Sequence, residues 1–94
     1  METKHTPGPW AYTKEDQVVH LPGDYSKMIA DIRGRGWLQK LPNGAEVQDA
    51  NGKLIAAAPE LLKACIEALK HHQGGHSEIG YMLHQAIKKA TGND

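Results

Sequence analysis

The sequence predicts a small α+β domain in which an antiparallel β-meander of about three strands packs against two to three α-helices. Two observations predict it. The first half of the chain alternates apolar and polar residues in short runs that are separated by turn residues, as strands do. The second half repeats apolar residues at helical spacing. We expect one domain over residues 1–94, with a flexible segment over 1–6, the meander over 7–38 and the helical part over 45–91.

Turn residues divide the first half into three expected strands. The Pro7-Gly8-Pro9 segment stiffens the backbone before a strand over residues 10–13, in which Trp10 and Tyr12 share one face. The polar turn Lys14-Glu15-Asp16 joins this strand to one over 17–21 and predicts a hairpin. Pro22-Gly23-Asp24 is a second turn signal, and a third strand is expected over 27–32.

The stretch over residues 50–62 organises the second half because it combines a helical apolar pattern with a proline. Pro59 cannot continue a helix from before it but suits the first turn of the next, so two helices should meet at a corner, the second reaching about His72. Ser77 is the expected N-cap of a third helix that ends near Thr91-Gly92. The buried stripe of the first helix is predicted to hold Val47, Ala50, Asn51, Leu54, Ile55 and Ala58.

Composition restricts the classes of function. Eleven basic and eleven acidic residues balance, so the positive field of a nucleic-acid-coating or lipid-binding protein is missing and nucleic acid is not expected as a partner. The single cysteine, Cys65, excludes an intrachain disulfide and fits a reducing, cytosolic compartment. No apolar run is long enough to span a membrane. A chain of 94 residues buries a small core, which favours a homo-oligomer.

The segment Arg33-Gly34-Arg35-Gly36-Trp37 is the first candidate for a ligand site. Its glycines permit close approach of a ligand to the backbone, its two guanidinium groups suit phosphate, and Trp37 offers a ring on which a base can stack. The alternative is a glycine-rich loop with solvated arginines and a tryptophan that closes the core. Asn51 presents the same choice, because a carboxamide on an apolar stripe must bond either neighbouring backbone or a ligand.

Catalytic and metal sites are not expected. His72, His76 and His84 lie across a glycine break, and neither a cysteine nor a carboxylate pair completes a tetrahedral set of metal ligands. Cys65 lies on an apolar stripe, where burial lowers thiol reactivity. The remaining candidates for acid or base groups are Asp31, Glu46 and His20, which form no recognised motif. The expectation is therefore a protein that is not an enzyme and uses no cofactor.

Two segments carry a resemblance to known proteins. The opening His5-Thr6-Pro7-Gly8-Pro9-Trp10 and the stretch Ala50-Asn51-Gly52-Lys53-Leu54-Ile55-Ala56-Ala57-Ala58-Pro59-Glu60-Leu61-Leu62 resemble a set of short phage and prophage proteins. Those proteins have an "HTPGPW" opening and an "NARLIAAAPELL" helix pair. This chain departs from the pattern at Gly52, which replaces alanine and weakens the helix, and at Lys53, which replaces arginine and loses its planar fork.

The resemblance implies a phage anti-defence protein of the host bacterial cytoplasm. Such a protein would sequester a nucleotide immune signal, such as a cyclic nucleotide or an ADP-ribose derivative, between the copies of a homo-oligomer. One alternative is a protein that binds and inhibits a host defence enzyme, and another is a phage nucleic-acid accessory protein. The expected ligand-binding residues are Trp10, Arg33, Arg35, Trp37 and Asn51, together with His5 from the opening motif.

Overall fold

The computed structural model describes residues 4–33, 36–72 and 77–92. By its contacts the chain divides into two compact units, one formed by residues 7–59 and the other by residues 1–6 together with 60–94. Each unit is described by itself. The expectation of a single domain over 1–94 stays a prediction.

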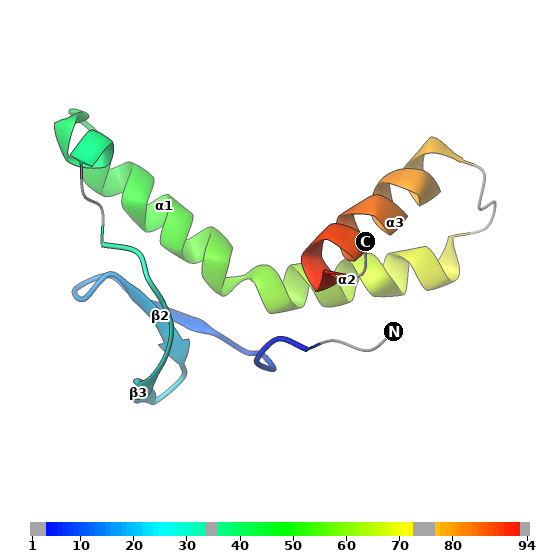
Figure 1. The fold of residues 1–94 in the computed structure, drawn as a ribbon, viewed down its shortest axis with the longest axis horizontal. Coiled ribbons are helices and arrows are strands. Elements are labelled where there is room, and N and C mark those ends of the chain that lie inside the picture. Colours follow the sequence, from blue (N-terminus) through cyan, green and yellow to red (C-terminus); the bar gives the residue numbers. More distant parts are fainter. Residues whose placement is uncertain (1–3, 34–35, 73–76, 93–94) are drawn as a thin grey trace. The chain divides into compact units, whose positions relative to one another are not determined.

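The unit over residues 7–59 contains one antiparallel sheet in the order β1-β2-β3, formed by Ala11–Thr13, Val18–Leu21 and Asp24–Asp31 (Figure 1). In the first hairpin Ala11 pairs with His20 and Thr13 with Val18. This sheet and the three α-helices confirm the predicted α+β fold class. Val18 and Val19 are buried on the central strand, where both neighbouring strands cover the backbone.

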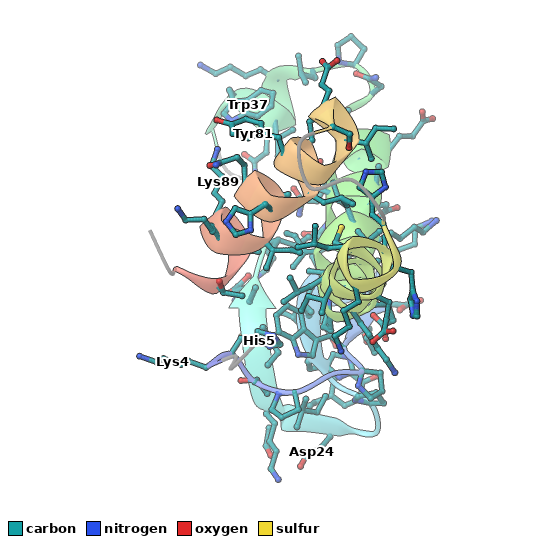
Figure 2. The ribbon with its side chains drawn as sticks, turned by 90° about the vertical axis from the view of Figure 1, so that its right-hand side faces the viewer. Lys4, His5, Asp24, Trp37, Tyr81 and Lys89 are labelled. Carbon is teal, nitrogen blue, oxygen red and sulfur yellow. The ribbon has the colours of Figure 1, made fainter. Side chains whose placement is uncertain are left out.

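The third strand begins three residues earlier than the sequence pattern predicts. Gly23 has a φ of 76°, which lets the chain reverse over Pro22 and Gly23, and Leu21 then pairs directly with Asp24. Asp24 lies at this end of the hairpin (Figure 2). The pairing of β2 with β3 is irregular on both sides of His20, so β3 has more residues than the strand it pairs with.

A 3₁₀-helix, η1, covers Gly36–Lys40, where the sequence indicated only a loop and a turn. The chain continues into α1, Gly44–Ala56, through two successive turns in which the Leu41 N–H donates to the Leu38 carbonyl (3.2 Å) and the Gly44 N–H donates to the Leu41 carbonyl (3.1 Å). These bonds explain the 3₁₀ geometry, because each closes over three residues. Helix α1 contacts η1, β1 and β2.

The predicted buried stripe of α1 is wrong. The buried residues are Gly44, Gln48 and Gly52, spaced four apart, whereas Asn51 is exposed and Leu54 is 63% exposed. The glycines decide which face packs, since they allow the helix backbone to approach its neighbours more closely than an alanine or leucine face can. At Gly52 that neighbour is the ring of Tyr12 on β1.

The other unit contains most of α2, Ala58–His71, and all of α3, Glu78–Thr91 (Figure 1). Pro59 lies in the first turn of α2, as predicted. Ser77 is the N-cap of α3 and its hydroxyl oxygen accepts a hydrogen bond from the Gly80 N–H (3.0 Å). Gly92 ends this helix in the left-handed conformation, with a φ of 72°. Both predicted caps are therefore confirmed. Ile87 of α3 is fully buried.

One polar contact joins the sheet to α1. The hydroxyl of Tyr12 donates to the carboxylate of Asp49 (2.7 Å), and Lys14 lies 3.6 Å from the other oxygen of that carboxylate. Desolvation, followed by the hydrogen bond to Asp49 and its negative charge, raises the pKa of Tyr12 from 10.0 to about 12. The contact therefore requires a protonated Tyr12.

Stability is expected to fall at high pH because of this contact. The pKa of Tyr12 is higher in the folded chain than in the unfolded chain, so its contribution is complete below pH 10 and is lost as the pH rises toward 12. Urea denaturation at a series of alkaline pH values measures the loss. Tyr12→Phe is the control, because it keeps the ring and removes the ionising hydroxyl. If Tyr12→Phe loses as much stability over the same pH range as the unaltered protein, Tyr12 is not the responsible group.

Candidate functional site

A small hollow between η1 and the start of α1 is the best-formed candidate site within the unit over residues 7–59. It has a volume of about 240 Å³. Gln48 of α1 lines it and is 4% exposed, yet its Nε2 has no hydrogen-bond partner among the described residues. Buried amide groups are almost always hydrogen-bonded in folded proteins. The complete described lining is Gln17, Leu38, Gln39, Leu41, Pro42, Gly44, Ala45 and Gln48.

Further hydrogen-bond donors lie at the start of α1, beside Gln48. The first backbone N–H groups of a helix have no carbonyl partner inside it. Asn43 is the N-cap of α1, but its side chain accepts no capping hydrogen bond. The backbone N–H of Ala45, in this first turn, is therefore left for another partner beside the hollow that Ala45 lines. The hollow thus brings donors together from a side chain and from a helix terminus.

Gln17 connects this hollow to a second one. It lines both the hollow beside Gln48 and an open groove of about 330 Å³, which lies next to β3. Its φ is 55°, a left-handed conformation that is uncommon for a residue other than glycine. Two backbone hydrogen bonds hold it there: its N–H donates to the Thr13 carbonyl (2.8 Å), and its carbonyl accepts from the Ile32 N–H (3.1 Å). The described residues that line the groove are Glu15, Asp16, Gln17, Val18, Tyr25, Met28 and Arg33.

Arg33 supplies the positive charge of the groove. Its Nε donates to one oxygen of Asp31 (2.9 Å) and its Nη2 to the other (2.5 Å). This hydrogen bonding to a carboxylate raises the pKa of Arg33 above its ordinary value, so its charge is constant. The bonds use Nε and Nη2, and they fix the plane of the guanidinium group while Nη1 is directed elsewhere. Arg33 is therefore oriented before any ligand arrives.

Tyr25 supplies an aromatic surface in the same groove. It is 59% exposed, and its ring lies 4.5 Å from that of His20, measured between centroids. His20 is itself fixed: its Nδ1–H donates to the Leu21 carbonyl (2.7 Å), and its Nε2 accepts from the Thr13 hydroxyl (2.6 Å). A carbonyl can only accept, which places the imidazole proton on Nδ1. The buried histidine thus supports the tyrosine ring and has neither nitrogen directed to a ligand.

Of the six predicted ligand-binding residues, only Arg33 lines one of these two hollows. Trp37 lies on η1 and is 66% exposed (Figure 2). Asn51 is exposed on α1, and Trp10 is half-buried. His5 belongs to the other unit, and its Nδ1 bonds the Thr6 carbonyl (2.8 Å; Figure 2). Arg35 lies outside the described residues, as does His76 of the histidine set considered for metal.

The candidates for acid–base chemistry do not converge. His20 is engaged at both nitrogens, Asp31 pairs with Arg33, and Glu46 is exposed on α1. His72 Nε2 contacts the Ser77 hydroxyl, and that hydroxyl already caps α3, so the pair stabilises a helix terminus. Within the described part of the chain, no three histidine, cysteine or acidic residues are placed to hold a metal ion.

Sequence reasoning missed Gln48, Gln17 and Tyr25. A usable signal existed for Gln48, because it lies four residues from both Gly44 and Gly52 and therefore on the face that packs most closely. Gln17 and Tyr25 gave no comparable signal. The conformation of Gln17 depends on its backbone bonds to Thr13 and Ile32, which come from two different parts of the sheet.

The sequence comparisons identify a family. The family model described as Salmonella phage P22 protein Y8K6 matches residues 1–94, which is the whole chain. The chain belongs to this family. Membership of the Y8K6 family confirms that this is a small phage protein, while the anti-defence role implied by the resemblance stays a prediction. No curated protein and no solved structure matches the chain. None of the described helices combines the length and the apolar content that crossing a membrane requires.

Proposed function

We propose that this phage protein binds a nucleotide-derived immune signal and sequesters it in the host bacterial cytoplasm without altering it. The observation that supports the proposal is the groove beside β3, where the oriented guanidinium of Arg33 lies with the exposed ring of Tyr25. A base stacks on an aromatic ring, and a phosphate bonds an arginine. The volume of about 330 Å³ falls within the range of small-molecule sites, which is roughly 300–1,000 Å³.

The acidic residues of the groove favour a ligand with ribose over a bare phosphate. Glu15 and Asp16 line the groove with Arg33. Their carboxylates repel phosphate oxygens but accept hydrogen bonds from ribose hydroxyls, as acidic residues do in dinucleotide-binding folds. An ADP-ribose derivative has more free hydroxyls than a cyclic nucleotide. It is therefore the better match to this combination of one cation, one ring and two carboxylates.

A second copy of the chain would complete the site. Tyr25 is 59% exposed and Met28 is 50% exposed, so one chain leaves the groove open to solvent. Burying these side chains against a second copy would exclude water and strengthen the bond to Arg33. We therefore propose a homo-oligomer in which the ligand lies between copies. Native mass spectrometry of the intact assembly reports the copy number and any retained ligand in one measurement.

Titration calorimetry with cyclic nucleotides and ADP-ribose derivatives tests the proposal. We expect micromolar or tighter binding of an ADP-ribose derivative, and recovery of that ligand unchanged when the complex is heated. Arg33→Gln should weaken binding about 10- to 100-fold, because it removes a charge-assisted hydrogen bond. Lys27→Gln is the matched control, since Lys27 is an exposed cation of β3 that does not line the groove. An absence of binding at micromolar concentrations, or equal effects of the two substitutions, would contradict the proposal.

The second candidate function is inhibition of a host defence enzyme by direct binding. It is supported by three exposed apolar side chains near the start of α3, which are Ile79 (62%), Tyr81 (63%) and Met82 (61%). A pull-down from host lysate separates the candidates. A stoichiometric protein partner whose binding is lost in Tyr81→Ser favours the inhibitor, and a small molecule released on heating favours the sequestering protein.

A further inference from the structure

The buried amide of Gln48 requires an explanation that the groove beside β3 does not give. Its Nε2 has no partner among the described residues although the side chain is only 4% exposed. A buried donor that has lost its bond to water and gained none in the protein destabilises the fold. Since this donor lines a hollow of about 240 Å³, a bound molecule in that hollow can be its partner.

The hollow selects a neutral ligand that carries a hydrogen-bond acceptor. None of the eight described residues that line it has an ionisable side chain, so a buried anion would have no counter-charge there. Glu46, in the first turn of α1, also opposes an anion at this helix terminus. Gln48 Nε2 and the Ala45 N–H are both donors, and one carbonyl oxygen has two lone pairs with which to accept from both.

The size and the walls of the hollow restrict the ligand further. Its volume lies below the range of about 300–1,000 Å³ that is typical of drug-sized ligands, which excludes a whole nucleotide. Leu38, Leu41 and Pro42 form an apolar wall suited to a ring. The amide of Gln17 lies in the same lining and has an oxygen that can accept from the N–H of a ligand amide.

We infer that this hollow is a binding site for a compact, neutral ring that carries an amide group, either a carboxamide or the lactam edge of a nucleobase. The ligand carbonyl accepts from Gln48 Nε2 and from the first turn of α1, and the ring packs on the leucines of the wall. The inference depends on the contacts of the hollow alone and stands without Arg33 or the groove. It adds a second site to the one proposed for nucleotides, with Gln17 shared between the two.

An NMR titration of the full-length protein with nicotinamide tests the inference. Nicotinate, the same ring with a carboxylate in place of the carboxamide, is the comparison ligand. We expect saturable binding of nicotinamide at millimolar concentrations or below, with shifts of the Leu38 and Leu41 methyl signals. We expect nicotinate to bind at least about tenfold more weakly, because its charge is not compensated in the hollow.

Gln48→Met tests the role of the amide, and Gln85→Met is its matched control on the exposed surface of α3. Gln48→Met should weaken nicotinamide binding about 3- to 10-fold, the effect of one lost hydrogen bond. Without ligand it should be as stable as the unaltered protein or more so, because it removes an unpaired buried donor. Gln85→Met should change neither property.

Three results would overturn the inference: no methyl shifts with nicotinamide, equal binding of nicotinate, or unaltered affinity in Gln48→Met. The first is also what a hollow filled only by water would give. The methyl shifts are measured on the unaltered protein, so the test does not depend on whether Gln48→Met folds. Failure here leaves the nucleotide proposal intact, because the calorimetric test of Arg33 uses different ligands at a different groove.

Discussion

Replacing Gly52 with alanine is expected to destabilise the protein, although alanine is the better helix former. In an open helix position this change would stabilise by about 1 kcal/mol. At Gly52 the added methyl would lie 2.3 Å from the Cε1 atom of Tyr12 and 2.6 Å from its Cζ atom, inside van der Waals contact. Because the ring is held by the bond from Tyr12 to Asp49, it cannot rotate away without losing that bond.

The expected net loss is about 1–2 kcal/mol, since overpacking costs about 1–3 kcal/mol and the helix preference returns about 1 kcal/mol. A double-mutant cycle with Tyr12→Val gives the sharper test. Once the ring is gone, Gly52→Ala should become stabilising, and the sign of its effect should reverse. Urea denaturation of the four proteins measures both effects. If Gly52→Ala stabilises the chain that keeps Tyr12, the close approach of β1 to α1 is not as described.

Periodicity predicted most of the local structure because local rules decide it. The Lys14-Glu15-Asp16 turn, the Ser77 cap and the Gly92 end each depend on a few neighbouring residues, and the structure places each where the pattern indicated. The face of α1 that packs was not predicted. Apolar content favoured the stripe with Leu54, but the glycine face approaches the sheet and η1 more closely and is the one buried.

The sites depend on irregularities that a periodic pattern cannot show. Tyr25 and Met28 are three residues apart, so in a regular strand they would face opposite sides of the sheet. The irregular pairing beside His20 changes the alternation between them, and both side chains line the groove. Gln17 reaches both hollows from a left-handed backbone conformation that its residue type does not suggest. Arg33 was the one site residue that composition could find.

Replacing Gly44 with alanine is expected to be at least as costly as replacing Gly52, and no side-chain substitution should relieve it. The added methyl would lie 2.1 Å from the carbonyl oxygen of Leu38, which is backbone. Relief therefore requires η1 to move away from α1, and this strains the bond from the Gly44 N–H to the Leu41 carbonyl (3.1 Å). Adding a weakened hydrogen bond to the overpacking gives an expected loss of about 2–3 kcal/mol.

The contrast between the two glycines is itself a test of how α1 is packed. Leu38→Ala shortens the side chain but leaves the carbonyl oxygen in place, so Gly44→Ala should cost the same with and without it. Tyr12→Val, by comparison, removes the very atoms that oppose a methyl at Gly52. Coupling near zero for the first pair, against about 2–3 kcal/mol for the second, is the result expected of backbone contact at one end of the helix and ring contact further along it. Strong coupling between Leu38 and Gly44 would mean that a side chain, and not the peptide backbone of η1, sets the width of the hollow beside Gln48.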